Sequence, residues 1–391
     1  MNPLGWTAAL LAFAVLVACS AFGSDDASDP STTADDASTA DGGELCPAEE
    51  PDAGGATEAL CDGSTIPVEL SSNTHCGSCT RDCLGNQCVQ ARCQPFDLAP
   101  AEPPSYPAAQ LTARDSQHVY WVHEDTVRAM PSHQTGTPTV IAKRTDADAG
   151  EGTFLKEIQV DQTYGFVRAA DGIFRFPLQG GDGTLSKLRI DGYAYVRAFA
   201  IDAQVIYSTD VNRQRILRMS KDGTGTTEIV PGHRPLGPIV ADGTFVFWLD
   251  GGEPDAGMGA AVARTNPQGS EVSLLAKGLG NPTSLAMDAT YVYWADSATR
   301  QIARVPKRGG AVMPITTAPV GPVTALAVDD QHVYWLAPDT AGANSQTLSK
   351  ASKCGGGTTI LATTLGAQNF VVDDAYVFLA QYERPFLRIR K

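Results

Sequence analysis

Short apolar segments and polar turns alternate along the chain from residue 95 to residue 391, and the pattern repeats about every 43 residues. Each repeat has an aspartate five residues before an aromatic side chain, and successive aspartates are 46, 41, 40, 46, 41 and 44 residues apart. The seven pairs are Asp115/Tyr120, Asp161/Phe166, Asp202/Tyr207, Asp242/Phe247, Asp288/Tyr293, Asp329/Tyr334 and Asp373/Phe378. Repetition at this length is typical of folds that copy and stack one supersecondary unit.

Four short strands are predicted in each repeat. In the fifth, Ser284–Met287 is an apolar segment directly before the aspartate, and Ile302–Lys307 alternates apolar and polar residues after the aromatic. Gly309-Gly310 then forms a hairpin turn, and a fourth apolar run follows, as at Ile360–Ala362 in the sixth repeat. One such sheet cannot bury both faces by itself. We therefore expect an all-β, seven-bladed β-propeller of four-stranded antiparallel blades over residues 95–391, with the aromatic rings filling the gaps between blades.

The two ends of this region suggest how the ring closes. The last repeat stops at its third strand, Leu387–Ile389, with no chain left for a fourth. Pro95–Ala99, at the start of the region, is apolar enough to supply that strand. Such a seam would leave no open sheet edge at the junction of the first and last blades.

The repeats resemble those of YWTD propellers. Tyr293–Asp296 (Tyr-Trp-Ala-Asp) and Tyr207–Asp210 (Tyr-Ser-Thr-Asp) carry the resemblance, and Phe247–Asp250 carries it more weakly. NHL-type propellers are equally similar. YWTD domains have six blades, and several repeats here lack the terminal aspartate, so the resemblance supports the blade and not the number of blades.

The N-terminal residues predict export and lipidation. Ala8–Ala18 is an apolar run too short to span a bilayer and suited to a signal peptide, residues 1–18. Its end, Leu16-Val17-Ala18-Cys19, resembles the lipobox of bacterial lipoproteins, which implies that Cys19 is acylated, with palmitate among its chains, and anchors the protein to the cell-envelope membrane. Ser20 favours the outer membrane or cell surface. The alternative is an ordinary signal peptide and a soluble secreted product, because Met1–Trp6 has no Lys or Arg.

Residues 19–45 are predicted to form a lipidated, disordered acidic tether, because they are rich in Ser, Thr, Ala, Asp and Gly and have little to bury. Residues 19–80 hold 13 acidic side chains, whereas residues 81–391 carry 29 basic and 31 acidic ones, so most of the net charge of −15 belongs to the N-terminal arm. A nearly neutral large domain argues against nucleic acid as a partner. Calcium binding by the tether is an alternative, without the spaced ligands of an EF-hand.

Residues 46–94 are predicted to form a small disulfide-rich module. Its cysteines are Cys46, Cys61, Cys76, Cys79, Cys83, Cys88 and Cys93. The Cys-Gly-Ser-Cys core resembles modules that precede propellers in secreted bacterial proteins, and few apolar residues lie between the cysteines, so covalent links must replace a core. A redox pair at Cys76 and Cys79 and a zinc site are the alternatives. Because seven is odd, we hypothesise that one of these cysteines pairs with Cys354.

One face of the ring is the candidate binding face. Loops between strands 2 and 3 of a blade, and between strand 4 and the next strand 1, lie on the same face, and insertions at 143–152, 250–260 and 337–346 all fall in such loops. Drift in tolerant surface loops explains the insertions equally well. The candidate residues are His123, Glu124, Arg213, Arg300 and Arg384. The three arginines are expected at equivalent positions around the channel mouth, where they would bind carboxylates; the alternative is solvated loop residues or salt bridges to Asp210, Asp296 and Glu383.

The sequence contains no nucleophile elbow, phosphate loop, HExxH motif or triad order. The repeated aspartates are expected to cap their own turns, and His118 and His332 are repeat equivalents with structural roles. We therefore expect no catalytic residue, cofactor or metal. The favoured function is a monomeric, membrane-anchored extracytoplasmic binding or scaffold protein whose propeller contacts a protein, peptide or glycan. The alternatives are a metal-dependent lactonase or hydrolase using Glu124, Glu157 and Asn281, and a purely structural envelope protein.

Overall fold

The computed structural model describes residues 58–60, 67–69, 87–89, 92–93, 95–99, 110–145, 154–179, 183–188, 195–252, 259–317, 321–339, 345–367, 369–379 and 386–391. The chain divides into two units, Met1–Pro47 and Ala48–Lys391, and all of the described residues belong to the second. The predicted signal peptide, lipidation site, tether and most of the cysteine-rich module therefore lie outside the described residues. In the part that is described, every regular element is a strand, and no helix is long and apolar enough to cross a membrane.

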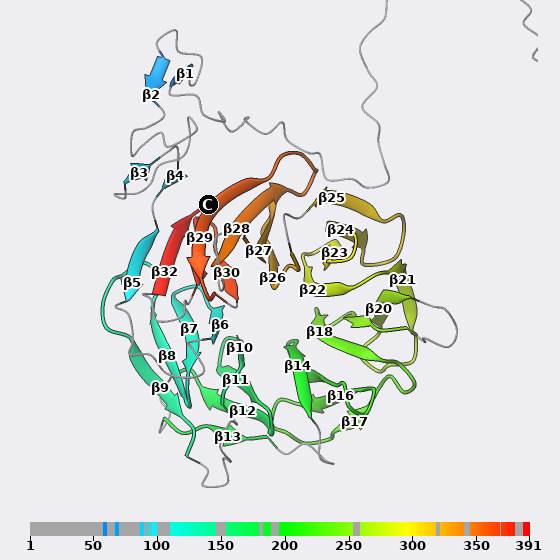
Figure 1. Ribbon diagram of the computed structural model, residues 1–391. Coiled ribbons are helices and arrows are strands. Elements are labelled where there is room, and N and C mark those ends of the chain that lie inside the picture. The colour runs from blue at the N-terminus through cyan, green and yellow to red at the C-terminus, as the bar shows by residue number, and fades with distance from the viewer. Residues whose placement is uncertain are drawn as a thin grey trace, which may run out of the picture. The chain divides into compact units, whose positions relative to one another are not determined.

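Seven antiparallel sheets of four strands form a ring, and this confirms the predicted seven-bladed β-propeller (Figure 1). Blade 1 contains β6 (Gln110–Arg114), β7 (His118–His123), β8 (Thr126–Pro131) and β9 (Thr139–Lys143). Blade 2 contains β10 (Glu157–Val160), β11 (Tyr164–Ala169), β12 (Gly172–Pro177) and β13 (Ser186–Lys187). Blade 3 contains β14 (Val196–Ile201), β15 (Val205–Asp210), β16 (Arg215–Ser220) and β17 (Thr227–Glu228). Blades 4 and 5 contain β18 (Pro235–Ala241), β19 (Val246–Asp250), β20 (Ala260–Thr265) and β21 (Ser273–Leu279); and β22 (Pro282–Met287), β23 (Tyr291–Asp296), β24 (Gln301–Pro306) and β25 (Met313–Thr317).

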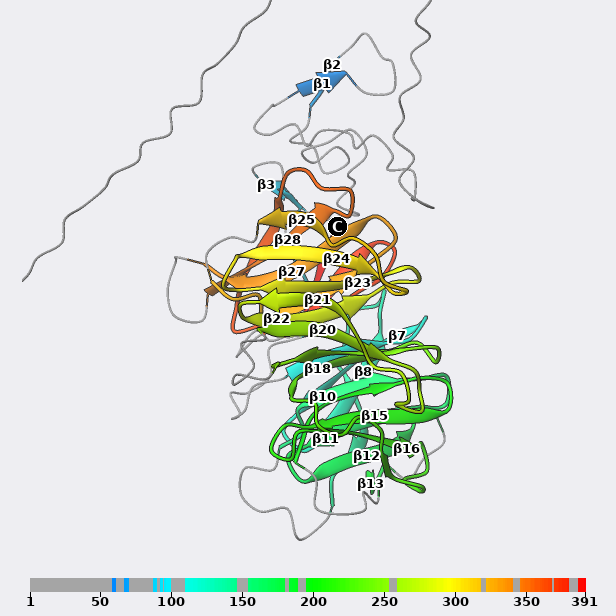
Figure 2. The same ribbon diagram turned by 90° about the vertical axis from the view of Figure 1, so that its right-hand side faces the viewer.

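Blade 6 contains β26 (Ala325–Val328), β27 (His332–Pro338), β28 (Ser345–Ser352) and β29 (Thr359–Leu365), and blade 7 contains β30 (Phe370–Val372), β31 (Tyr376–Leu379), β32 (Phe386–Arg390) and β5 (Phe96–Ala99). Before the ring, β1 (Glu58–Leu60) pairs with β2 (Pro67–Glu69), and β3 (Cys88–Val89) pairs with β4 (Arg92–Cys93). The first strand of each blade lies nearest the ring axis, and the turns collect on two opposite faces (Figures 1 and 2). We call the face with the 2–3 turns and 4–1 connections the binding face, and the other the pin face.

The ring closes through β5, as the sequence predicts. Strand β5 pairs with β32, with Phe386 opposite Ala99 and Arg388 opposite Phe96. Beside this seam the rings of Trp121 in blade 1 and Phe386 in blade 7 stack at 4.6 Å. The edge that β32 would otherwise expose is therefore covered by a strand from the start of the propeller.

The hydrophobic core is divided among the seven junctions between blades. At one of them Tyr293 of blade 5, which is 0% exposed, packs with Val333 and Trp335 of blade 6. Equivalent clusters join each of the other neighbouring pairs. The repeated aromatic rings thus fill the gaps between sheets, which confirms their predicted role.

The repeated aspartates cap the 1–2 turns on the pin face, as predicted. In blade 5, Asp288 Oδ1 accepts hydrogen bonds from the backbone N–H groups of Thr290 and Tyr291 at 2.8 and 2.7 Å, and Oδ2 accepts the Tyr293 hydroxyl at 2.5 Å. The Oδ1 contacts recur in all seven blades. These aspartates are therefore structural residues and not a ring of ligands or acids.

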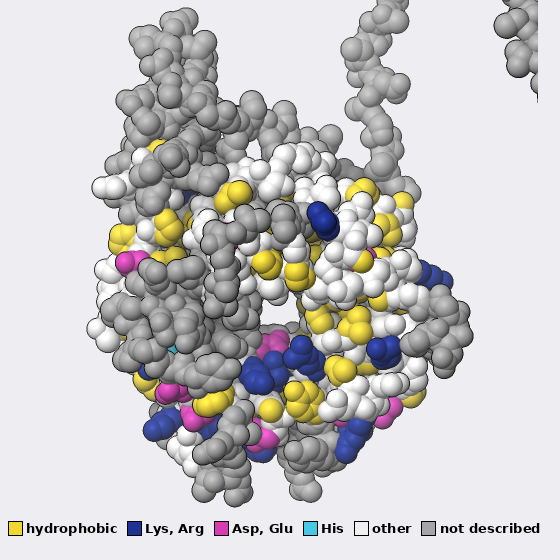
Figure 3. All heavy atoms as spheres, in the orientation of Figure 1, with side chains coloured by type: hydrophobic (Ala, Val, Ile, Leu, Met, Phe, Trp, Pro, Cys, Tyr) yellow, Lys and Arg dark blue, Asp and Glu magenta, His cyan; other side chains and the backbone are white. Residues whose placement is uncertain are grey.

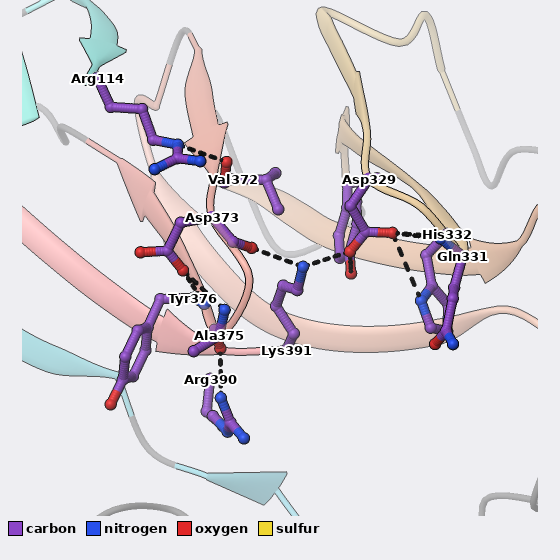
Figure 4. Close-up of polar contacts among 11 residues, drawn as sticks. Arg114, Asp329, Gln331, His332, Val372, Asp373, Ala375, Tyr376, Arg390 and Lys391 are labelled. Atoms are coloured by element: carbon purple, nitrogen blue, oxygen red, sulfur yellow. Dashed lines mark hydrogen bonds and ion pairs between the residues drawn. The ribbon is translucent and has the colours of Figure 1, made fainter. Parts of the chain in front are cut away.

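Four of these aspartates also bind a lysine from the following blade, and we call these contacts the inter-blade pins. They are Lys221–Asp161 at 2.6 Å, Lys307–Asp242 at 2.6 Å, Lys353–Asp288 at 2.5 Å, and Lys391–Asp329. Figure 4 shows Lys391 between the Asp329 carboxylate and the backbone carbonyl of Asp373. Burial opposes ionisation of Asp329, but Lys391 and the capped N–H groups outweigh it and lower the pKa of Asp329 to about 2.

Cys88, Cys93 and Cys354 are each disulfide-bonded. Cys354 lies in the turn between β28 and β29, on the pin face. The other predicted disulfide cysteines lie outside the described residues, and the connectivity stays a prediction.

Candidate functional site

The binding face presents exposed charged residues in its 2–3 turns. Glu124, Arg213 and Arg300 are all exposed there. Glu124 and Arg300 have left-handed backbone conformations, with φ of 54° and 57°. Such conformations are uncommon for residues other than glycine, and here they occur in the tight turns between strands 2 and 3.

The three predicted arginines do not occupy equivalent positions, and the sequence interpretation was wrong on this point. In blades 3 and 5 the 2–3 turn has four residues, 211–214 and 297–300. Arg213 is the third residue of its turn and Arg300 is the fourth, where blade 3 has Gln214 with φ 53°. The offset is present in the spacing itself, because Arg213 follows Tyr207 by six residues and Arg300 follows Tyr293 by seven. Arg384 lies outside the described residues.

His123 is buried rather than displayed. It ends β7, is 6% exposed, and its Nδ1 lies 3.4 Å from Nη2 of Arg128. Of the three insertions, residues 146–152, 253–258 and 340–344 lie outside the described residues. The insertion loops therefore stay a prediction.

Three buried aspartates end strand 2 of blades 3, 4 and 5 on the binding face. They are Asp210, Asp250 and Asp296, exposed by 1%, 4% and 3%. The Asp296 carboxylate accepts the backbone N–H groups of Gly280 and Asn281 at 2.8 and 2.9 Å, so it fastens the preceding 4–1 connection to the end of β23. Asp210 accepts Nε of Arg215 at 3.2 Å and the backbone N–H of Arg213 at 3.2 Å. The predicted salt bridge from the Arg213 guanidinium to Asp210 is thus made by Arg215 instead.

His233 and Asp250 form a pair that the sequence analysis missed. His233 Nδ1 lies 2.8 Å from Asp250 Oδ2, which also accepts the indole N–H of Trp248 at 3.0 Å. Burial opposes ionisation of Asp250, but the hydrogen bonds from His233, Gly252 and Trp248 outweigh it and lower its pKa. Sequence spacing did not reveal the pair, because 16 residues lie between His233 and Asp250. The two meet only where the connection from blade 3 to blade 4 folds against the end of β19.

The channel wall of blade 2 contains a partly buried carboxylate. Glu157, on the inner strand β10, accepts Nε of Arg168 at 3.1 Å, and Arg168 Nη1 donates to the Val196 carbonyl of blade 3 at 3.1 Å. Burial raises the pKa of Glu157 despite the adjacent guanidinium. The group joins blades 2 and 3 near the channel mouth.

The three residues considered for a lactonase-type metal site lie in three different blades, and two of them are hydrogen-bonded to other side chains. Glu124 belongs to blade 1, Glu157 is bonded to Arg168 in blade 2, and Asn281 donates to Ser297 Oγ at 2.7 Å in blade 5. Within the described ranges there is no group of three or more His, Cys, Asp or Glu side chains that could hold a metal ion.

No protein-family model matches the chain, and no curated protein matches it. Among solved structures it is similar to a streptogramin B lyase, with 13% identity over 76% of this chain and 96% of that chain and a TM-score of 0.57. It is similar to virginiamycin B lyase from Staphylococcus aureus, with 12% identity over 76% and 98% and a TM-score of 0.57. It also matches the extracellular domain of a putative one-component system from B. thetaiotaomicron, with 10% identity over 75% and 40% and a TM-score of 0.56. At these identities the similarity concerns the fold alone.

Proposed function

We propose that this protein is an extracytoplasmic binding or scaffold protein that presents the binding face of its propeller to a protein, peptide or glycan. The observation that carries the proposal is the difference between the two faces. On the pin face, four aspartates and four lysines pair with each other between neighbouring blades. On the binding face, Glu124, Arg213 and Arg300 are exposed in short turns fixed by the sheets.

Charged side chains in short turns suit ligand recognition, because such turns lose little conformational freedom when a ligand binds. The extracellular domain among the similar structures has a comparable fold, although its low identity says nothing about its ligand here.

The experiment is binding of the purified full chain to glycan and peptide arrays. Arg213→Glu and Arg300→Glu together reverse charge on the binding face, and Arg308→Glu reverses charge in the exposed β24–β25 turn on the pin face. We expect the binding-face variant to lose wild-type array signals by about tenfold or more, which corresponds to 1.4 kcal/mol, and the pin-face variant to keep them. Equal signals for both variants would contradict the proposal.

We also propose that acylated Cys19 anchors the protein to the cell envelope, on the outer membrane or cell surface. The support is the lipobox-like Leu16-Val17-Ala18-Cys19 and the acidic, Ser- and Thr-rich segment that follows. Labelled palmitate should enter the wild-type chain and not Cys19→Ala, and the variant should move from the membrane to the soluble fraction. A variant that stays labelled would refute acylation at this residue.

An enzyme is the second candidate, and the His233–Asp250 pair is the observation that favours it. A carboxylate bound to Nδ1 orients an imidazole and raises its basicity, as general-base catalysis requires. A hydrolysis screen with lactone and ester substrates would test this. Turnover that His233→Gln abolishes without lowering the melting temperature would favour the enzyme over the binding protein.

A further inference from the structure

Two arginines lie at the channel mouth between blades 3 and 4. Arg197 is the second residue of the inner strand β14, and Arg234 directly precedes the inner strand β18. Both side chains are exposed. Figure 3 shows Lys and Arg side chains beside the central opening of the ring, near the strand that Figure 1 labels β14, with an acidic side chain next to them.

Two glycines of blade 4 pack against the stems, that is the aliphatic parts, of both arginine side chains. A Cβ atom at Gly237 would lie 3.2 Å from Cγ of Arg197, and one at Gly251 would lie 3.3 Å from Cδ and Nε of Arg234. Each stem thus packs against glycine backbone, in space that a side chain at the glycine position would fill. Gly237 has φ of 137°, and its carbonyl accepts Thr209 Oγ1 of blade 3 at 3.0 Å, so this surface is itself fixed.

The neighbouring carboxylates are bonded to other residues. Asp210 accepts Arg215, Asp250 contacts His233, and Glu157 accepts Arg168, at 3.2, 2.8 and 3.1 Å. Among the described residues none of these acids forms an ion pair with Arg197 or Arg234. Arg197, Arg234 and, on the turn after β15, Arg213 are thus three exposed guanidinium groups on the binding face.

This charge is a local feature, because residues 81–391 carry 29 basic and 31 acidic side chains. An exposed guanidinium group that forms no ion pair within the described residues can bind an anionic group of a ligand. Each guanidinium also offers a planar set of donors that matches two oxygens of a carboxylate or phosphate. Stems packed on backbone lose less freedom when such a bond forms.

We propose that Arg197 and Arg234 form a binding site for an oxyanion group, carboxylate or phosphate, of a ligand that docks at the channel mouth. This inference rests on the proposed binding function and names the chemistry that the face recognises. Gly237 and Gly251 are positioning residues for the two arginines, and Arg213 extends the positive surface toward the outside of the ring.

Isothermal titration of the purified full chain with citrate and with tripolyphosphate at low salt tests the proposal. We expect saturable one-to-one binding of at least one anion, weakened about tenfold by Arg197→Gln and by Arg234→Gln. Arg308→Gln removes the same charge from the pin face and should leave the affinity unchanged. Citrate binding alone identifies a carboxylate ligand, tripolyphosphate binding alone identifies a phosphate ligand, and either supports the site.

Arg197→Lys separates a fork of donors from simple charge. Arg197→Lys should restore less than half of the affinity that Arg197→Gln loses, because a lysine supplies the charge without the planar pair of donors. Melting temperatures within about 2 °C of wild type would show that the variants fold.

Absence of saturable binding to both anions, or equal weakening by Arg308→Gln, would overturn the oxyanion site. In that case array signals that still depend on Arg213 and Arg300 would leave the proposed binding function intact. Loss of array signals as well would remove both.

Discussion

The two oxygens of each repeated aspartate have different partners. Oδ1 is bonded to the backbone of its own turn, and this local contact follows from the residue type and its place before a strand. Oδ2 accepts the tyrosine hydroxyl in the four blades that have a tyrosine. In four blades it binds a lysine 60 to 65 residues away in the chain. One side chain thus shapes a turn and joins two blades.

Replacing Asp329 by Asn should separate these roles, because Asn still caps the turn but carries no charge for Lys391. The pair is largely buried, with side chains 20% and 13% exposed, so we expect a loss of about 2 kcal/mol in unfolding free energy at pH 7. Asp202→Asn is the matched control, since in the described residues Asp202 caps its turn and accepts Tyr207 but binds no lysine. Chemical denaturation of both variants measures the difference.

The same pair predicts a pH dependence. The pKa of Asp329 falls from 3.8 to about 2 on folding, so the charged form stabilises the native state above pH 4, and this contribution is lost as the pH falls toward 2. The difference between Asp329→Asn and wild type should therefore shrink over that range. A gap that is constant from pH 7 to pH 2 would show that the charge has no part in it.

At the scale of the strand, the sequence analysis predicted most of the fold and little of the site. Periodicity identified the blades and even β5, because strands are short, local and repeated. The turns were predicted less well: Arg213 and Arg300 were treated as equivalent, although they are the third and the fourth residue of turns of equal length. Arg197 and Arg234 were missed because their significance comes from Gly237 and Gly251 in another strand or turn.

Strand β5 should be necessary for a closed ring. Leu98 is 1% exposed and packs with Trp121 and Phe386 at the seam. Leu98→Asp places an unpaired charge in that cluster and should cost roughly 3–5 kcal/mol. Asp97→Ala, at the exposed neighbouring position, should change stability by less than about 0.5 kcal/mol. Thermal unfolding compares them, and equal melting temperatures would mean that the seam contributes nothing.

At the scale of the whole molecule, contacts between blades lie on the pin face and the proposed ligand contacts lie on the binding face. The cysteines bear on how the ring is oriented. Cys354 is disulfide-bonded and lies in a turn of the pin face. Every other cysteine lies between residues 19 and 93. A bond from Cys354 to the cysteine-rich segment would attach that segment, and the tether before it, on the pin side of the ring. A lipid-anchored chain held in this way would direct its binding face away from the membrane.

This arrangement predicts one covalent link that can be measured directly. Non-reducing proteolysis and mass spectrometry should find the peptide containing Cys354 joined to a peptide from residues 46–93, and reduction should release both. Thr358→Ala, in the same turn, should leave the cross-link in place, whereas Cys354→Ser should remove it and leave one cysteine of the segment reactive to a thiol reagent. A wild-type chain whose Cys354 reacts with that reagent before reduction has no such link, and its binding face would then be free to turn toward the membrane.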